Sequence, residues 1–293
     1  MREPIFQADR LSLRLQRRFA VLAMGLLAGV LAPLATRPAL AQDFTKFTAG
    51  SARLVDHAVW DKQLKSFVMP AKDGINRVDF GRWKKEGHAE LKSYVASLEK
   101  VDFTTLDRPE QFAFWANLYN AKMIDVVLDK YPVKSIKDIS LGGGLKTLVT
   151  GGPWQAKIVK VNGIAMSLDD IENSAMRPVL KDPRVHYSVN CASIGCPNLL
   201  GEAFTGAKLQ GQLDAAAKAF VNHPRAFDIR DGKIVKASSI YTWFQADFGG
   251  SVAGVLDHAR KYAEPALKQK LESITTIEAY DYDWKLIDAK SGA

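Results

Sequence analysis

The chain has 293 residues, of which 47% are apolar and 25% are charged, and its formal net charge is +8. Six arginines and two acidic residues lie in residues 1–41 and supply +4 of that charge, so the remaining 252 residues carry only +4. That charge is too small to indicate a nucleic-acid partner, and no cluster of lysine and arginine is interleaved with aromatic residues. A chain of this length and composition can bury the core of one large domain.

The first 41 residues have the three parts of a removable signal peptide. A basic head ends at Arg17-Arg18, an apolar run covers residues 19–34, and Ala39-Leu40-Ala41 forms a small-residue cleavage site. The run is shorter than the roughly 20 residues that span a bilayer, and an uncleaved anchor is the alternative. We therefore expect a periplasmic or secreted protein with no transmembrane segment after signal removal. Export would follow the general secretory route or, given the arginine pair, the twin-arginine route.

The first part of the remaining chain is predicted to be helical. Residues 42–50 are expected to be a flexible start and residues 51–293 a single domain. Apolar residues recur at every third or fourth position in residues 55–68 and 83–98, which predicts two amphipathic helices.

A third and longer helix is predicted to begin after Asp107. Asp107 is a good N-cap, Pro109 suits the first turn, and Glu110 stands in the capping-box position. The helix should run to about residue 130, because Tyr131-Pro132 cannot continue it.

The second half of the domain is predicted to mix short strands and helices. An apolar period of two predicts a hairpin at residues 157–166, with Asn162-Gly163 as its turn, and Asp231-Gly232 predicts a second hairpin. Further strands are predicted at residues 184–190 and 276–286, and further helices at residues 168–176, 207–222 and 251–274, the first of them stopped by Pro178. This is an α+β fold class, in which several helices pack on a small, mostly antiparallel sheet.

Both cysteines of the chain, Cys191 and Cys196, lie in one loop at the end of a predicted strand. In an exported protein a disulfide between them is one expectation. A zinc site would need two more ligands, and the five histidines are scattered, so no metal site is expected. The third interpretation makes Cys191 a nucleophile, which requires a base. His186 is a candidate, but in an extended strand it would lie about 16 Å away on the opposite face, so a distant histidine such as His223 would serve equally well.

Several other polar residues are candidates for a site. His186, Ser188 and Asn190 would share one face of the predicted strand. Asn117 and Asn120 lie three residues apart in the long aromatic helix, where a buried amide either holds a neighbouring loop or lines a ligand pocket.

Three charged residues complete the candidate set. Glu172 and Arg177 are expected to form an ion pair that braces their helix. Asp283 lies on the closing strand and could orient a histidine.

Five segments of the chain together resemble the domain of unknown function family numbered 547. The resemblance extends over residues 112–286, and it implies no established activity. It implies that the matching residues gather in one place: Asn117, Asn120, Glu172, Arg177, His186, Cys191 and Asp283. This chain has Asn173 where the family often has histidine, so a histidine there cannot belong to its mechanism. The matching segments are residues 114–121, 168–173, 184–197, 243–249 and 282–284.

Two functions follow as hypotheses. In the first, the exported domain is a cysteine-dependent hydrolase or acyl transferase that acts on an envelope peptide or amide. Cys191 would attack, His186 would accept its proton, and Asn117 or Asn190 would stabilise the oxyanion, as in papain- and transglutaminase-like hydrolases. In the second, a Cys191–Cys196 disulfide stabilises a non-catalytic module that binds an envelope peptide, glycan or protein. No cofactor is expected in either case.

Overall fold

The helix at the centre of the N-terminal half is α4 (Arg108–Lys130), and almost every residue on it is buried. In this computed structural model, residues 43–142 and 151–292 are described, so the predicted signal peptide lies outside them. The predicted start of α4 is confirmed: the Asp107 side chain accepts a hydrogen bond from the Glu110 backbone N–H at 3.0 Å. Tyr131 is extended and ends the helix. Within the described residues, no helix combines the length and apolarity that crossing a membrane would require.

Two shorter helices, α2 (Phe80–Glu86) and α3 (His88–Leu98), pack on α4, and α1 (Ala58–Phe67) packs on both of them. The single helix predicted over residues 83–98 is wrong, because Gly87 divides it into α2 and α3. A Cβ at Gly87 would lie 2.9 Å from the rings of Phe67 and Trp83, so glycine lets α1 and α2 pack closely there. Strands β1 (Val68–Met69) and β2 (Arg77–Val78) form a two-stranded antiparallel sheet beside these helices, and η1 (Phe103–Thr105) leads into α4.

The hairpin predicted at Asn162-Gly163 is confirmed as β3 (Val159–Val161) and β4 (Ile164–Met166). Both turn residues have positive φ, 48° and 82°, as a tight two-residue turn requires. The next helical stretch does not stop at Pro178 as predicted. It runs through α6 (Leu168–Asp170), the π-helix η3 (Ile171–Met176) and α7 (Arg177–Leu180), because Pro178 occupies the first turn of α7, where its missing N–H is not needed.

The strand predicted at residues 184–190 is wrong, because its centre is the short helix α8 (Val185–Ser188). Local hydrogen bonds favour the helical turn: the Asp182 carboxylate accepts from the Arg184 N–H at 2.9 Å, and the Ser188 hydroxyl donates to the Val185 carbonyl at 2.7 Å. No strand pairs with this segment among the residues that the structure describes.

The C-terminal half packs a second group of helices on a three-stranded sheet. The helices are η4 (Gly206–Lys208), α9 (Leu209–Val221), α10 (Ile240–Trp243), α11 (Val252–Tyr262) and α12 (Pro265–Glu272). Strands β5 (Phe227–Arg230) and β6 (Lys233–Ser238) form the hairpin predicted at Asp231-Gly232, and β7 (Tyr280–Asp281) pairs with β6 in parallel. The sequence predicts a closing strand over residues 276–286, but only β7 within that range is a regular strand. The short helices η2 (Ile136–Asp138) and η5 (Ala289–Gly292) complete the described elements.

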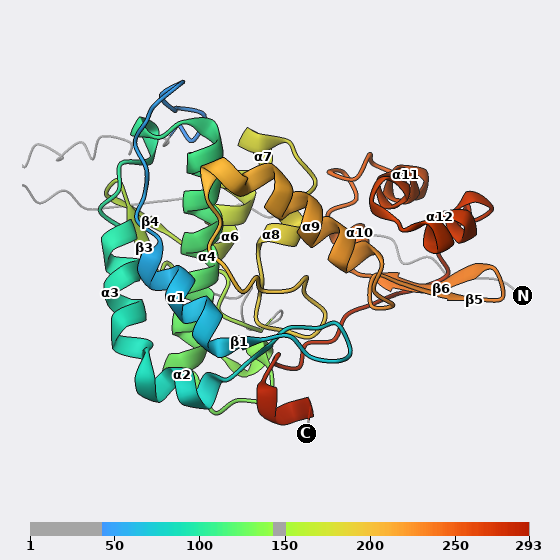
Figure 1. Cartoon of the computed structure of the whole chain (residues 1–293), viewed down its shortest axis with the longest axis horizontal. Helices are drawn as coiled ribbons and strands as arrows, with labels where there is room; N and C mark the ends of the chain where they lie inside the picture. The colour runs from blue at the N-terminus through green and yellow to red at the C-terminus, as the bar shows by residue number, and fades with distance from the viewer. Residues whose placement is uncertain (1–42, 143–150, 293) are drawn as a thin grey trace, which may run out of the picture. The chain divides into compact units, whose positions relative to one another are not determined.

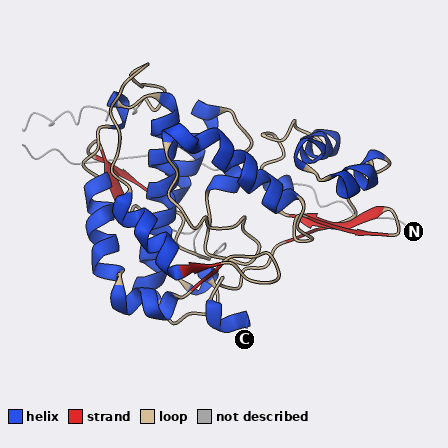
Figure 2. Ribbon diagram, viewed as in Figure 1, coloured by secondary structure: helices blue, strands red, loops and turns tan. Residues whose placement is uncertain are grey.

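The architecture is mixed α+β, as predicted, but the strands of residues 43–142 and 151–292 form three small sheets instead of one. Figure 1 shows α1–α4, blue to green, on one side and α11, α12 and the β5–β6 hairpin, orange to red, on the other, with α8 and α9 between them. Figure 2 shows how short the strands are beside the helices. Two hydrophobic cores correspond to the two sides, one around α4 and one around α9, and Tyr282 packs against both. The segments that meet at this junction form the candidate site.

Candidate functional site

A pocket of about 160 Å³ lies at the junction of the two cores. Its walls come from α4, η3, α8, the cysteine loop, α10 and the segment after β7. Aromatic side chains predominate, and the polar groups are two carboxylates, one imidazole and both thiols. The lining residues are Tyr119, Trp154, Asp169, Glu172, His186, Val189, Cys191, Cys196, Pro197, Ile240, Trp243, Phe244, Tyr282 and Trp284.

The two cysteines are buried free thiols that share hydrogen-bond partners. The Cys191 backbone N–H donates to Cys196 Sγ at 2.9 Å, and the Tyr282 hydroxyl lies 2.9 Å from the same sulfur. Cys191 Sγ lies 2.9 Å from the Ser193 hydroxyl and 3.1 Å from the Tyr282 hydroxyl. One tyrosine hydroxyl therefore reaches both sulfurs.

These contacts make the two thiols unequal. Burial opposes ionisation of Cys196, but hydrogen bonds from the Cys191 thiol, the Tyr282 hydroxyl and the Cys191 N–H outweigh it and lower the pKa of Cys196 to about 7. Burial and the adjacent Cys196 sulfur raise the pKa of Cys191 well above its usual range. Cys196 is thus the more acidic of the two thiols, and thiolate is the nucleophilic form of cysteine.

The cysteine loop is held from α4 by amide side chains. The Asn120 amide donates to the Ser188 carbonyl and accepts from the Asn190 N–H, both at 2.8 Å. The Asn190 amide in turn donates to the Pro197 carbonyl at 2.6 Å and accepts from the Ala192 N–H at 2.7 Å. Ala192 has a φ of 61°, a strained value for a residue other than glycine, and the bond from Asn190 helps to hold it there.

The segment after β7 holds the loop from the other side. The backbone N–H groups of Ile194 and Gly195 donate to the carbonyls of Lys285 and Asp283, both at 2.8 Å. A Cβ on Gly195 would lie 2.9 Å from the Tyr282 ring, so the close approach that brings the Tyr282 hydroxyl to the sulfurs depends on glycine.

His186 lies between two carboxylates, and its side chain is 1% exposed. Its Nε2 is 2.7 Å from Asp247 Oδ2, and its Nδ1 is 3.3 Å from Glu172 Oε1, a distance suited to ion pairing but without hydrogen-bond alignment. The Phe244 ring stacks on the imidazole, with centroids 4.1 Å apart. The ring is therefore fixed on three sides.

The carboxylates decide the charge of this histidine. Burial alone would lower the pKa of His186, but Asp247 and Glu172 outweigh burial and raise it. The hydrogen bond from His186 and the ion pair with Arg177 hold the pKa of Asp247 far below its usual range. Both shifts favour the charged form of the His186–Asp247 pair.

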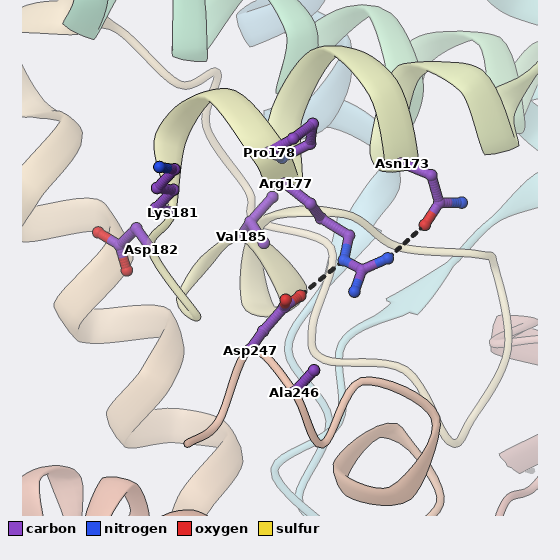
Figure 3. Close-up of a pocket in the computed structure, with 8 residues that line it drawn as sticks. All are labelled: Asn173, Arg177, Pro178, Lys181, Asp182, Val185, Ala246 and Asp247. Carbon is purple, nitrogen blue, oxygen red and sulfur yellow. Dashed lines mark hydrogen bonds and ion pairs between the residues drawn. The ribbon is translucent and has the colours of Figure 1, made fainter. Parts of the chain in front are cut away.

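A larger hollow of about 440 Å³ lies on the outer side of Asp247 (Figure 3). The Arg177 guanidinium spans it, donating to Asp247 and to the Asn173 side chain, both at 2.6 Å. Asp247 therefore separates this hollow from His186. No cysteine lines the hollow, so we place the chemistry in the smaller pocket.

The structure brings some of the sequence-predicted residues together. His186, Glu172, Cys191 and Cys196 all line the pocket, because α8 is a helical turn and the extended-strand argument for a separation of about 16 Å was wrong. However, the ring nitrogens of His186 face carboxylates, and the sulfur of Cys191 is bonded to hydroxyl groups. Arg177 pairs with Asp247, which corrects the expected pair with Glu172.

The remaining predicted residues lie outside the pocket lining. The Asn117 amide donates to the Phe204 carbonyl at 2.8 Å and accepts from the Phe204 N–H at 3.0 Å, so it holds a backbone segment. The Asn117 and Asn190 amides thus bond backbone groups, and neither residue lines the pocket in which the oxyanion contact is expected. Asp283 is half-exposed and does not orient a histidine; Asp247 does. His223 bonds the Asp73 carbonyl, away from the cysteines.

Sequence reasoning missed Tyr282 and Asp247 as site residues. Both stand in segments that carry the family resemblance, at residues 282–284 and 243–249, and that resemblance was the available signal. The sequence interpretation considered Cys196 only as a disulfide partner. In the structure, the Cys196 sulfur receives more hydrogen bonds than the Cys191 sulfur.

A group of side chains outside the pocket could bind a metal by its chemistry. His88, Asp125 and Asp129 offer ligand atoms within 4.8 Å of one another. Lys92 and Lys122 already bind the Asp125 carboxylate, at 2.8 and 2.7 Å. We therefore regard this group as an ion-pair network between α3 and α4.

Residues 103–221 match the family model described as "Protein of unknown function, DUF547". This chain carries a DUF547 domain. A search of curated proteins and a search of solved structures each found no match. The DUF547 match contains Glu172, His186 and both cysteines but ends before Asp247 and Tyr282. The C-terminal segments beyond the match therefore complete the pocket.

Proposed function

We propose that this protein is exported, loses residues 1–41, and acts as a cysteine-dependent acyl transferase or hydrolase on an envelope peptide or amide. The observation that carries the proposal is the environment of Cys196. A backbone N–H and a tyrosine hydroxyl converge on its sulfur at 2.9 Å, inside a pocket that also holds the imidazole of His186. A thiol with a lowered pKa beside a proton donor is the combination that acyl transfer needs.

In the proposed first half-reaction, the Cys196 thiolate attacks the carbonyl carbon and forms a carbon–sulfur bond. The carbon–nitrogen bond then breaks, and the leaving amine takes a proton that comes from His186. Glu172 carries this proton, because its carboxylate lines the pocket and lies 3.3 Å from His186 Nδ1. The products are a thioester on Cys196, a free amine and neutral His186.

In the second half-reaction, water or another amine attacks the thioester. The carbon–sulfur bond breaks, the Cys196 thiolate returns, and the proton of the attacking group passes back through Glu172 to His186. Asp247 stabilises the imidazolium in both steps, since its hydrogen bond to Nε2 is 2.7 Å. Papain- and transglutaminase-like enzymes use a related thiol and imidazole, which is an analogy of chemistry and not of fold.

A second candidate function rests on how close the sulfurs lie. Cys196 Sγ contacts the Cys191 backbone N–H, and both sulfurs bond the same hydroxyl, so a Cys191–Cys196 disulfide needs only a small movement. In an oxidising compartment that bond would remove the nucleophile and leave a binding module for an envelope peptide, glycan or protein.

Intact-mass and thiol analysis of protein isolated from the periplasm separates the two functions. Recovery of the reduced mass, with one thiol alkylated far faster than the other, supports the enzyme. A mass lower by two hydrogens with no alkylatable thiol supports the binding module.

Acylation by p-nitrophenyl acetate then tests the nucleophile. The reduced protein should gain the mass of one acetyl group, as should Cys191→Ser, whereas Cys196→Ser should not. An adduct that persists in Cys196→Ser would contradict the proposed role of Cys196.

A further inference from the structure

Arg225 bonds the cysteine loop on both sides of Cys196, although it lies beyond the DUF547 match, which ends at residue 221. Its guanidinium donates to the Ile194 carbonyl at 3.2 Å and to Asn198 Oδ1 at 2.8 Å. One of these acceptors stands two positions before Cys196 and the other stands two positions after it. The two bonds therefore fix the segment of the loop that carries this sulfur.

Arg225 does not line the pocket that holds the two sulfurs. It lines a separate hollow of about 200 Å³, together with Ile194 and Gly195 of the cysteine loop. A substrate bound beside Cys191 and Cys196 would therefore not touch the guanidinium. Arg225 can influence the chemistry of the pocket only through its charge and through the position of the loop.

The Arg225 guanidinium is a largely buried cation without a carboxylate partner. No aspartate or glutamate of the described residues lies within ion-pair distance of it, and its buried Nε has no hydrogen-bond partner among them. Asp73 attracts it at longer range but is already paired with Arg77 at 2.6 Å. Because burial of an uncompensated cation is costly, another anionic group is expected nearby.

Cys196 is the group that best fits this role. Burial lowers the pKa of Arg225 to about 10, and the Cys196 sulfur opposes that effect more strongly than any other charged group. Since the coupling between two charges is reciprocal, the guanidinium favours the Cys196 thiolate to the same extent. The pocket itself offers no permanent positive charge to the sulfur, because no lysine or arginine is among the described residues that line it.

The other titratable groups around Cys196 are those that line the pocket with it. None of them is altered in the variants described below, so a change in the ionisation of Cys196 reports on Arg225. These groups are Tyr119, Asp169, Glu172, His186, Cys191 and Tyr282.

From this placement we propose that Arg225 is a positioning residue of the site, whose guanidinium is the counter-charge of the Cys196 thiolate and holds the loop segment around it. The proposal rests on the proposed function in one respect, which is that Cys196 is the nucleophile. It assigns a role to the turn between α9 and β5, which contributes no side chain to the pocket lining.

Variants of Arg225 that keep or remove the charge test the proposal on the reduced protein. The measurement is the pH dependence of iodoacetamide alkylation at Cys196, followed by peptide mass spectrometry. Arg225→Gln should raise the alkylation midpoint by about 0.5–1 pH unit, which slows the reaction about three- to tenfold below the midpoint. Arg225→Lys keeps the charge and should leave the midpoint close to that of the unaltered protein.

Arg225→Met is a second neutral variant, in case the polar glutamine is not tolerated. Its apolar chain leaves no buried donor unpaired, so the variant should fold, and it should raise the midpoint in the same direction. The matched control is Arg230→Gln, which removes an equal charge from an exposed position on β5 that pairs with Asp228, and it should change nothing. The shift in the neutral variants should persist at about 1 M salt, because buried charges are screened much less than exposed ones.

Each alternative outcome contradicts the proposal in a specific way. An unchanged midpoint in both neutral variants would overturn the counter-charge. Equal shifts in Arg225→Lys and Arg225→Gln would show that the residue acts only through the shape of the loop. An equal shift in Arg230→Gln, or loss of the shift at high salt, would show that only the overall charge of the protein matters.

These outcomes are separable from the acyl chemistry, because alkylation of a thiol needs no acyl transfer. A protein whose midpoint depends on Arg225 but which gains no acetyl adduct from p-nitrophenyl acetate keeps this inference and loses the proposed enzyme. A protein that gains the adduct at Cys196 but whose midpoint is independent of Arg225 keeps the enzyme and loses this inference.

Discussion

The Tyr282 hydroxyl is the group whose removal tests the thiol environment most directly. It lies 2.9 Å from Cys196 Sγ and 3.1 Å from Cys191 Sγ, and the Tyr282→Phe substitution removes it without removing the ring. The ring contacts with Trp243 and Trp284 should remain, so the pocket wall is preserved. The substitution therefore isolates one hydrogen bond to a thiolate.

The size of the effect follows from the charge on the acceptor. A hydrogen bond to a charged group contributes about 1.5–3 kcal/mol, and one pKa unit corresponds to about 1.4 kcal/mol. Losing the Tyr282 bond should therefore raise the pKa of Cys196 by about 1–2 units from its value of about 7. The hydrogen bonds from the Cys191 thiol, the Cys191 N–H and the Ser193 hydroxyl remain and limit the change.

The measurement is the pH dependence of iodoacetamide alkylation at Cys196 of the reduced protein, followed by peptide mass spectrometry so that Cys191 stays in place and the two thiols are read separately. Tyr280→Phe is the matched control, since it removes a tyrosine hydroxyl two residues away that has no contact with either sulfur. An unchanged alkylation midpoint in Tyr282→Phe, or an equal shift in the control, would refute the hydrogen-bonding argument.

Three further predictions concern packing and buried histidines. Gly195→Ala should destabilise the fold by about 1–3 kcal/mol in urea and slow alkylation, because the added methyl group would displace the Tyr282 ring. Gly211→Ala, in the exposed first turns of α9 with nothing within 4 Å, should instead raise stability by about 0.5–1 kcal/mol in the same assay. Burial lowers the pKa values of His57 and His258 to about 4, so the unfolded chain binds protons first as the pH falls below about 6.5. Stability should therefore drop by about 2–3 kcal/mol per histidine between pH 7 and 4.5, and His258→Phe should reduce this drop.

Local chemistry explains which parts of the fold could be predicted. The start of α4 depends on Asp107 and Glu110, three residues apart, and the first hairpin depends on Asn162-Gly163. In each case the residues that decide the structure are neighbours in sequence, so their pattern is sufficient.

Residues 184–190 could not be assigned correctly, because their conformation depends on distant partners. Over a segment this short, their alternation of polar and apolar residues is typical of a strand. The helical turn is instead fixed by Asp182 and by the amide of Asn120, which lies 70 positions before its partner Asn190. No residue within the segment indicates that Asn120 will contact Asn190.

The candidate site has the same limitation on a larger scale. Glu172, His186 and the two cysteines could be named from the sequence, but the partner of His186 could not, because Asp247 is 61 positions away and its neighbours Phe248 and Gly249 carry no catalytic signature. Asp283 was the alternative, and it lies at the surface. A carboxylate that orients a histidine is recognisable only when the fold has placed the two together.

The boundary of the DUF547 match has a physical consequence for the site. Residues 103–221 supply Cys196 and His186, but the group that fixes the charge of His186 and the hydroxyl that stabilises the Cys196 thiolate both come from beyond residue 221. An imidazole without Asp247 would lose one of the two carboxylates that raise its pKa against burial. The electrostatic state on which any thiol chemistry depends is therefore a property of the matched domain together with its C-terminal segments, and not of the matched domain alone.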